Sequence, residues 1–363
     1  MNTIVTFGEI MGRFAPPGFL RFRQAVPGPL DLTFGGAEAN VAASLAIFGA
    51  SARFVTALPH HAIADACVGV LAGLGVDTDH IVRTKKGRLG LYFLESGANQ
   101  RPSNVIYDRA HSSVSVTPAS EYKWDAIFEN ARWLHTTGIT PALSQVSAEA
   151  VQAAVKAAKT AGLQVSCDLN FRKKLWNWEP GTEAGALANK TMRAILPFVD
   201  VVIANEEDAA DVLGIHAAET DVHSGRVAAD KYPDVARQIV KRFPNVSLVA
   251  ITLRESCSAS HNNWGAMLYD AKSEGVHFAP LRAGQYEPWP IKNIVDRVGG
   301  GDAFGAGLIF ALTTPELAEP SQAVAFAVAA SCLAHSITGD INYTTRAEAE
   351  ALMQGSGAGR VVR

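Results

Sequence analysis

Short apolar runs rich in β-branched residues alternate along this chain with alanine-rich helical segments, and this alternation limits the folds open to it. Several runs, such as Val199–Ile203, are largely apolar on both faces, which is typical of parallel strands covered by helices on both sides. Gly49 and Gly162 each follow a helical segment, where glycine commonly ends a helix in the left-handed conformation. The pattern predicts a doubly wound α/β fold with a mostly parallel central sheet. Strands are expected at Thr3–Phe7, Arg53–Ala57, Trp133–Thr137, Leu163–Asp168, Val199–Ala204 and Val246–Thr252, and helices at Ala37–Phe48, Ser147–Ala161 and Val235–Arg242.

Two stretches interrupt this rhythm. Residues 14–33 and 89–116 alternate polar with apolar side chains and show no helical segment between their strands. Alternation with a period of two is typical of strands with one covered and one open face, so we expect a small antiparallel flap, or lid, over one edge of the main sheet. Residues 216–232 are polar and irregular and predict a surface insertion, and the tail 355–363 is expected to fray. Since we find no internal repeat or low-complexity tract, the chain is interpreted as one domain spanning 1–363 with the lid inserted in it.

The charge balance restricts the partners of the protein. The chain has 32 Lys+Arg and 35 Asp+Glu residues, a formal net charge of −3, and no basic stripe that would indicate nucleic-acid binding. Its first residues, MNTIVTFGEI, predict a strand and not a signal peptide, and the apolar stretch 323–337 is too short and too rich in alanine to span a bilayer. Four widely spaced cysteines without a CxxC pair favour reduced thiols. These features predict a cytoplasmic protein that acts on small molecules and contacts neither nucleic acid nor membrane.

The strongest local signal is the run DRVGGGDAFGAG at residues 296–307, which leads directly into an apolar stretch. Three glycines before a helix let consecutive backbone N–H groups converge, and the positive end of the helix dipole suits phosphate oxygens. A carboxylate at that place, Asp302, would repel a phosphate at rest, so its presence needs a functional reason. Accepting the proton of an attacking hydroxyl is such a reason. A glycine-rich loop with a helix-capping Asp is the competing interpretation, but a second acid six residues upstream, Asp296, favours function. The run therefore predicts a phosphoryl-transfer site with Asp302 as base and N–H donors at Gly299, Gly300 and Gly301.

This run resembles the D-x-x-G-x-G-D signature of ribokinase-like (PfkB-type) carbohydrate kinases. Two further elements match that family in its order: Gly35-Gly36-Ala37-Glu38-Ala39-Asn40, and Asn205-Glu206-Glu207-Asp208 after an apolar strand. The resemblance implies that Gly35, Gly36 and Asn40 contact the sugar. It also implies that Asn205 and Asp208 order Mg²⁺ and the nucleotide phosphates through water, with no direct protein ligand to the metal. Asp208 stands where the family usually has Glu, so its reach is one methylene shorter; a plain helix start and solvated surface acids are the alternative interpretations of the two elements.

Within that family the chain resembles the 2-keto-3-deoxygluconate kinases. Arg172 follows a predicted strand in the run Asp168-Leu169-Asn170-Phe171-Arg172, and Tyr107 and Arg109 lie two residues apart in the lid, hence on one face. Two arginines and a tyrosine aimed at one cleft suit a carboxylate, which guanidinium binds through paired hydrogen bonds. Arg254 stands where many relatives have Gly, so contact with nucleotide phosphate and exposure to solvent both remain open. The resemblance implies sugar-acid contacts at Tyr92, Tyr107, Arg109, Ile139, Arg172 and Asp340. The candidate nucleotide contacts are Asn205, Asp208, Thr252, Arg254, Gly299 and Gly301.

The expected reaction is therefore ATP-dependent phosphorylation of the terminal hydroxyl of 2-keto-3-deoxygluconate, with ATP and Mg²⁺ required and a role for a monovalent cation left open. A kinase for a neutral ketose or for 5-keto-2-deoxygluconate is the nearest alternative, and a non-catalytic sugar-acid binding protein is an alternative of another class. A dinucleotide-dependent oxidoreductase fits less well, because its glycine fingerprint would follow the first strand. A homodimer or higher homo-oligomer is expected, because the strand edges of the lid invite pairing between subunits.

Overall fold

The computed structural model describes residues 2–205, 207–217 and 229–355. In this part of the chain, nine strands form one large sheet, in the order β14-β13-β12-β11-β10-β9-β1-β4, with β17 paired to β13. All pairings from β4 to β12 are parallel, and β13 pairs antiparallel with β12, β14 and β17. The strands are β1 (Thr3–Phe7), β4 (Ala52–Val55), β9 (Ala131–Thr137), β10 (Gln164–Asp168), β11 (Val201–Ala204), β12 (Leu248–Ser258), β13 (His261–Asp270), β14 (Gly275–Ala279) and β17 (Trp289–Lys292).

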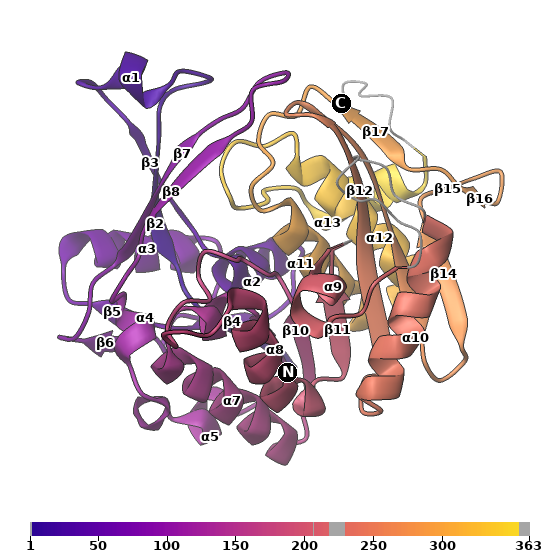
Figure 1. Ribbon diagram of the computed structural model, residues 1–363, viewed down its shortest axis with the longest axis horizontal. Helices are drawn as coiled ribbons and strands as arrows, with labels where there is room; N and C mark the ends of the chain where they lie inside the picture. The colour runs from indigo at the N-terminus through magenta and orange to yellow at the C-terminus, as the bar shows by residue number, and fades with distance from the viewer. Residues whose placement is uncertain (1, 206, 218–228, 356–363) are drawn as a thin grey trace.

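Helices cover both faces of this sheet (Figure 1). One layer contains α2 (Ala37–Ile47), α11 (Gly300–Leu312), α12 (Pro320–Ala334) and α13 (Arg346–Met353). The other contains α7 (Gln145–Thr160), α8 (Ala184–Ile195), α9 (Asp208–Leu213) and α10 (Tyr232–Arg242). The doubly wound fold predicted from the alternation of strands and helices is thus confirmed. Across the described ranges, no helix has the length and apolar character needed to cross a bilayer.

Two apolar cores fill the space between the sheet and its helices, and β1 shows how the sequence supplies both. Because successive strand residues point to opposite faces, Ile4 packs with α2 and α11 while Val5 and Phe7 pack with α7. All three side chains are fully buried. A strand that is apolar at consecutive positions therefore needs cover on both sides, which is the physical basis of the fold prediction.

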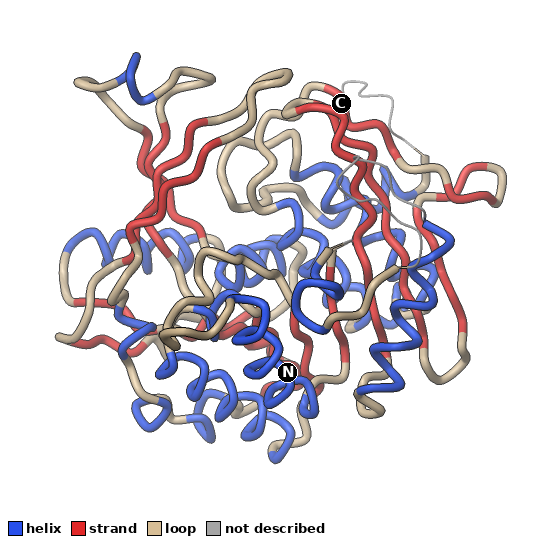
Figure 2. The backbone as a smooth tube through the Cα atoms, viewed as in Figure 1, coloured by secondary structure: helices blue, strands red, loops and turns tan. Residues whose placement is uncertain are grey.

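A smaller sheet stands away from the main body as the lid, visible as the indigo and magenta arm at the upper left of Figure 1 and as crossed red strands in Figure 2. Its order is β3-β2-β7-β8. The outer pairings are antiparallel, as expected, but β2 and β7 at its centre run parallel. Alternation of polar and apolar residues is the same for both strand directions, so the sequence pattern did not distinguish them. The strands are β2 (Met11–Ala15), β3 (Asp31–Gly35), β7 (Gly90–Glu95) and β8 (Asn104–Asp108).

Several local predictions need correction. The expected strand Arg53–Ala57 is split into β4 and the short β5, and the lid ranges 14–33 and 89–116 contain one-turn helices. The second of these, at 113–116, packs into the main body through Val114 and is not part of the lid. Most of the predicted insertion, 218–228, and the tail 356–363 lie outside the described residues, while Tyr232 is buried and begins α10. The remaining elements are α1 (Phe22–Ala25), α3 (Ala62–Gly73), α4 (Ser113–Val116), α5 (Trp124–Ile127), α6 (Ile139–Ala142), β5 (Ala57–Pro59), β6 (Val82–Thr84), β15 (Leu281–Arg282), β16 (Gln285–Tyr286), and 3₁₀ turns at Ala119–Glu121, Leu196–Phe198, Ala229–Lys231 and Pro315–Leu317.

Candidate active site

A cavity of about 350 Å³ opens where the parallel strands end, between the lid and the N-termini of α2 and α11. Polar side chains at the carboxyl ends of parallel strands meet at one edge of the sheet, which is where ligands bind in doubly wound folds. The cavity is lined by all but one of the predicted site residues: Gly36, Asn40, Tyr92, Tyr107, Arg109, Ile139, Arg172, Asn205, Asp208, Thr252, Arg254, Gly299, Gly300, Gly301, Asp302 and Asp340. Gly35 does not line it and packs behind the wall, where a Cβ atom would overlap the carboxylate of Asp340.

The glycine run forms the turn into α11, and each glycine has its own reason. Gly299 is the N-cap, with a φ of 83°, and a Cβ there would also overlap the carbonyl oxygen of Asp340. A Cβ on Gly300 would approach the ring of His335 to 2.9 Å. Gly301 faces open space, with no atom within 4 Å of the position of its absent Cβ. The first backbone N–H groups of a helix have no partner within the helix, so this turn presents donors to the cavity beside Gly301.

Asp302 lies in the first turn of α11, half-buried at the cavity wall. Its Oδ2 atom accepts a hydrogen bond of 2.7 Å from Nδ2 of Asn40, whose Oδ1 in turn accepts a bond from the backbone N–H of Gly36. Removal from water raises the pKa of Asp302 to about 7, although the hydrogen bond from Asn40 opposes that rise. A carboxylate with a pKa near 7 is matched to accepting a proton at neutral pH.

Two further acids line the cavity with Asp302: Asp168 ends β10, and Asp208 begins α9, which follows β11. Asp208 is buried and accepts hydrogen bonds from the backbone N–H groups of Phe171 and Asn205, each at 2.9 Å. Burial raises the pKa of Asp168, and the charges of Asp208 and Asp302 raise it further. Asp208 therefore ties two strand-end loops together, and the three carboxylates make this part of the cavity acidic. Within the described residues, no group of three or more His, Cys, Asp or Glu side chains is arranged to hold a metal ion.

The sugar side of the cavity holds the two predicted arginines in different settings. Arg109 is buried and forms an ion pair with Glu9, and its guanidinium also lies 5.3 Å from the centre of the Tyr107 ring. Its Nε is buried without a hydrogen-bond partner among the described residues. Arg172 is exposed and donates from Nη1 to the backbone carbonyl of Phe171.

The strand before Arg172 does not extend as far as Arg172. β10 ends at Asp168, and Asn170 has a φ of 38°. All three polar residues of this segment, Asp168, Asn170 and Arg172, nevertheless line the cavity. They are brought there by the turn and not by the alternation of a strand.

The residues predicted to contact nucleotide all line the cavity. Thr252 and Arg254 both belong to β12, which continues beyond the predicted end of the strand. The Oγ1 atom of Thr252 donates to the carbonyl of Ala204. Arg254 is half-buried in the cavity wall, which is compatible with nucleotide contact and does not match the alternative of simple exposure to solvent.

Sequence reasoning missed several residues of the site. Glu9 and Glu38 both line the cavity, and Glu38 accepts hydrogen bonds from Thr137 and Thr140. Burial raises the pKa of Glu38. The signal for Glu9 was its place directly after the first strand, where the carboxyl end of β1 reaches the site. Nothing in the sequence around Arg13 indicated its role, because a single arginine in an alternating strand is usually a solvated side chain.

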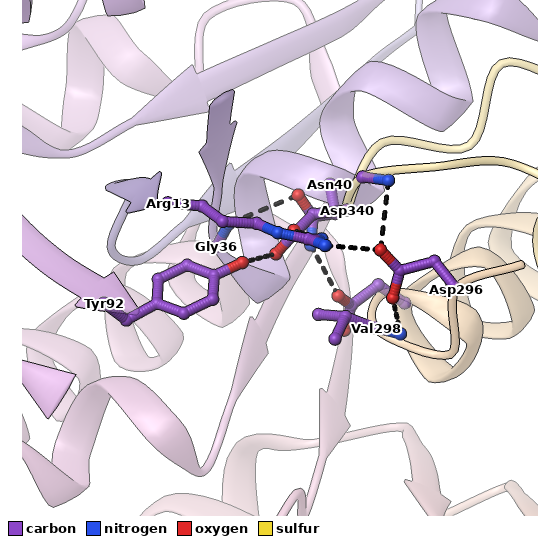
Figure 3. A network of polar contacts seen from close by, with 9 residues as sticks. Arg13, Gly36, Asn40, Tyr92, Asp296, Val298 and Asp340 are labelled. Atoms are coloured by element: carbon purple, nitrogen blue, oxygen red, sulfur yellow. Dashed lines mark hydrogen bonds and ion pairs between the residues drawn. The ribbon is translucent and has the colours of Figure 1, made fainter. Parts of the chain in front are cut away.

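Arg13 is at the centre of a buried network beside the cavity (Figure 3). It forms ion pairs with Asp340 at 2.7 Å and Asp296 at 2.5 Å. The hydroxyl of Tyr92 donates to the second oxygen of Asp340 at 2.5 Å. The network joins the lid, which carries Arg13 and Tyr92, to the segment that leads into the glycine turn.

This combination of a doubly wound sheet, a glycine turn at a helix N-terminus, an acid with a pKa near 7 and a lid defines a phosphotransferase that acts on a small hydroxyl compound. Residues 1–252 match the family described as pfkB family carbohydrate kinase. The chain belongs to this family and is an enzyme that phosphorylates a sugar, so the oxidoreductase and the non-catalytic binding protein are excluded.

Individual relatives are similar over nearly the full chain. A 2-dehydro-3-deoxygalactonokinase of Haloferax volcanii is 30% identical over 356 residues, covering 98% of each chain. A 2-dehydro-3-deoxygluconokinase of Bacillus subtilis is 27% identical and covers 84% of this chain and 81% of its own. The crystal structure of a 2-dehydro-3-deoxygluconokinase from Thermotoga maritima superimposes with a TM-score of 0.87 at 41% identity, covering 98% of this chain and 100% of that one. The resemblance read from the motifs is thus confirmed at the level of the family.

Proposed function

We propose that this enzyme transfers the γ-phosphoryl group of ATP to the terminal hydroxyl of a 2-keto-3-deoxy sugar acid, converting 2-keto-3-deoxygluconate to 2-keto-3-deoxy-6-phosphogluconate. The observation that carries the proposal is that two arginines, Arg109 and Arg172, line the same cavity as the acid Asp302. A carboxylate substrate gives both cations a partner, whereas a neutral sugar requires neither. Relatives named as kinases of 2-dehydro-3-deoxygluconate and 2-dehydro-3-deoxygalactonate support the same substrate class.

The buried pair of Glu9 and Arg109 is compatible with this role. A guanidinium has five N–H donors, and the contact with Glu9 uses the Nη2 end of Arg109. Its other donors remain for a substrate carboxylate beside Tyr107. Arg172, which is exposed and lines the same cavity, supplies the second cation.

In the proposed reaction, Asp302 accepts the proton of the terminal hydroxyl as its oxygen attacks the γ-phosphorus. The new bond joins this oxygen to phosphorus, and the bond between the γ-phosphorus and the bridging oxygen breaks, so that ADP leaves with the electron pair. Backbone N–H groups at Gly299–Gly301 donate to the oxygens of the transferred group and stabilise their charge. Asn40 holds the carboxylate of Asp302 in place through its 2.7 Å hydrogen bond.

ATP and Mg²⁺ fit the acidic end of the cavity. Asn205 and Asp208 lie at its wall, and Asp208 retains acceptor capacity on both oxygens beyond its two backbone hydrogen bonds. Hard cations such as Mg²⁺ keep several waters and prefer oxygen ligands, so these side chains would order the metal through its water shell. The metal would neutralise charge on the phosphates of the nucleotide. Thr252 and Arg254 would contact the nucleotide from β12.

A neutral ketose is the second candidate substrate, and one observation favours it. Glu9 neutralises Arg109 in this structure, which leaves Arg172 as the exposed cation on the sugar side. A tomato relative named Fructokinase-2 is 28% identical over 306 residues. The two candidates differ in whether the carboxylate of the substrate contributes to binding.

A substrate panel tests the proposal. ATP-dependent ADP release would be measured with 2-keto-3-deoxygluconate, its galactonate epimer, 5-keto-2-deoxygluconate, fructose and ribose. We expect kcat/KM for the 2-keto-3-deoxy acids to exceed that for fructose by at least about 100-fold, since each of the two charge-assisted pairs contributes about 1.5–3 kcal/mol. A higher kcat/KM with fructose or ribose would replace the sugar-acid proposal by the neutral-sugar one.

We also propose that the enzyme works in the cytoplasm as a homodimer or higher homo-oligomer. All four cysteines are free, which fits a reducing compartment. Apolar side chains are exposed in the lid region, among them Phe19, Leu32 and Ile106, and apolar surface of this kind is commonly covered by a second subunit. Light scattering after size-exclusion chromatography tests the assembly: a mass of 38.5 kDa would exclude the oligomer.

A further inference from the structure

A single guanidinium connects two carboxylates that belong to different parts of the active site. Arg13, on β2 of the lid, donates from Nη1 to Oδ1 of Asp340 and from Nη2 to Oδ2 of Asp296. Arg13, Asp340 and Asp296 are 3%, 6% and 7% exposed. Figure 3 shows the planar group lying between the two acids. Arg13 does not itself line the catalytic cavity.

One of these carboxylates, Asp296, fixes the start of the glycine turn. Oδ1 of Asp296 accepts a hydrogen bond of 3.1 Å from the backbone N–H of Val298, directly before Gly299. Oδ2, which also receives Arg13, accepts a bond of 3.2 Å from the N–H of Gly339. Asp296 therefore sets the course of the chain into the turn whose N–H groups face the transferred phosphoryl group.

The other carboxylate, Asp340, lines the cavity on the side predicted to bind the sugar. Its two oxygens are held by two residues of the lid, Arg13 and Tyr92. Arg13 and Tyr92 are direct partners in the register of the parallel pair β2 and β7, so their side chains leave the lid sheet side by side. The backbone of Asp340 lies against Gly299, close enough that only glycine fits there.

We propose that Arg13 is a positioning residue for phosphoryl transfer: by binding Asp340 and Asp296 together, it fixes the sugar-facing carboxylate relative to the phosphate-facing glycine turn. Transfer requires the attacking hydroxyl and the γ-phosphorus to meet in line and close together, and a misplacement of about 1 Å can cost about 100-fold in rate. The proposal rests on the sugar-kinase activity of the family and not on which sugar is the substrate.

The chemistry of the bridge requires arginine. The guanidinium is planar, and its two terminal nitrogens point to different acceptors in a fixed fork, whereas the ammonium of lysine is a point charge on a flexible stem. Buried ion pairs contribute little net stability, because desolvation offsets their attraction. An arginine held between two buried acids beside a reaction centre is therefore better explained by geometry than by stability.

The test compares Arg13→Met, Arg13→Lys and a control, Arg53→Met, in the full-length protein. Arg53 forms an ion pair of 2.6 Å with Asp77 and donates to the carbonyl of Ile127, but it does not line the cavity. Three quantities would be measured with the best sugar of the substrate panel: kcat per site that binds ATP, KM for each substrate, and the coupling ratio, defined as sugar phosphate formed per ADP released. A fall in the folded fraction does not change the coupling ratio, so this quantity separates positioning from stability.

We expect Arg13→Met to lower kcat per ATP-binding site by about 30- to 100-fold and the coupling ratio well below one, because a misplaced sugar hydroxyl lets water accept the phosphoryl group. KM for ATP should stay within about threefold of wild type. Arg13→Lys should restore the charge and part of the thermal stability but not the coupling, and Arg53→Met should keep a coupling ratio of one.

Two results would overturn the proposal. In the first, Arg13→Met has kcat per site within threefold of wild type and a coupling ratio of one. In the second, Arg13→Lys restores full activity, which would show that only charge compensation matters. If the wild type phosphorylates fructose or ribose in place of the sugar acids, the proposed substrate fails, but the same comparison with that sugar still decides the role of Arg13.

Discussion

Asn40 at the start of α2 donates a hydrogen bond of 2.7 Å to Asp302 at the start of α11, and this contact joins the two glycine motifs of the chain. The two residues are 262 positions apart. Both helices begin at a glycine turn that faces the cavity, Gly36 and Gly299. The motifs predicted to bind the sugar and the phosphate are therefore parts of one site, with the proposed base between them.

Removal of the base should separate binding from turnover. Asp302→Asn preserves the shape of the side chain but removes its ability to accept a proton, so kcat should fall by about 10²–10⁴-fold. Binding of ATP, measured by calorimetry, should stay within about threefold because the N–H groups of the turn are unchanged. The control is Asp125→Asn, on an exposed face of α5, which should match the wild type. Near-normal activity of Asp302→Asn would show that another group accepts the proton.

The pH dependence should report the same carboxylate. Since the pKa of Asp302 in the free enzyme is about 7, kcat/KM should fall on the acid side of pH 7, where the base becomes protonated. The hydrogen bond from Asn40 favours the charged form and so lowers this pKa. Asn40→Ala should therefore raise it and move the acid limb to higher pH, by about one pH unit.

A matched variant separates this effect from general damage. Asn189 lies on α8 and donates a hydrogen bond to the backbone carbonyl of Val212. Asn189→Ala should leave the acid limb in place. An acid limb that moves to lower pH in Asn40→Ala, or does not move at all, would contradict the assignment of the limb to Asp302.

Most of the fold and much of the site could be predicted from the sequence, because both depend on local patterns of residues. Strands that are apolar on both faces predicted a covered parallel sheet, and glycine runs predicted helix N-termini open to the cavity. Both signals come from neighbouring residues, whose chemistry acts whatever the rest of the chain does. The pfkB motifs also named Asp302 and Asn40, which the fold brings into contact.

The pairings that the sequence did not reveal are those set by tertiary packing. Glu9 meets Arg109 across 100 positions, and Arg13 meets Asp296 across 283. A charged residue in an alternating strand has no local feature that tells a buried ion pair from a solvated side chain. The parallel direction of β2 and β7 was hidden for a similar reason, since the period of two is common to both kinds of pairing.

Two alanine substitutions in the glycine turn, Gly301→Ala and Gly299→Ala, should have different effects on activity and on folding stability. Gly301→Ala would place a methyl group in open space within the cavity, so the free energy of unfolding should change by no more than about 1 kcal/mol. That methyl would intrude where phosphate oxygens approach, and kcat/KM for ATP should fall by about 10- to 100-fold. Gly299→Ala combines a φ of 83° with overlap on Asp340 and should cost about 2 kcal/mol or more of folding stability.

Gly69→Ala is the control for this pair. Gly69 lies in α3, also has no atom within 4 Å of its absent Cβ, and does not line the cavity. It should be neutral or slightly stabilising, with unchanged kinetics. Thermal unfolding and ATP-saturation kinetics of the three variants decide the matter; equal kinetics for Gly301→Ala and Gly69→Ala would remove the phosphate-binding role from the turn.

The arginines that distinguish a sugar acid from a neutral sugar need variants chosen for their surroundings. Arg172 is exposed, so Arg172→Met should fold normally and lower kcat/KM for 2-keto-3-deoxygluconate by about 10- to 100-fold, chiefly through KM. Arg109 is buried against Glu9, and its removal alone would leave an unpaired buried charge that costs about 3–5 kcal/mol. The informative variant is therefore the double substitution Glu9→Gln with Arg109→Met, which removes both charges together.

The double variant isolates the part that Arg109 plays in binding the carboxylate. We expect it to fold, to lose about 10- to 100-fold in kcat/KM for the sugar acid, and to change its kcat/KM for fructose by less than threefold, because a neutral sugar gains nothing from the lost cation. Arg88→Met is the matched control: Arg88 pairs with Asp108, next to Tyr107 and Arg109, but does not line the cavity. Steady-state kinetics on both substrates give the answer. Equal losses on the sugar acid and on fructose would assign Arg109 to the framework of the lid and leave Arg172 as the group that selects a carboxylate.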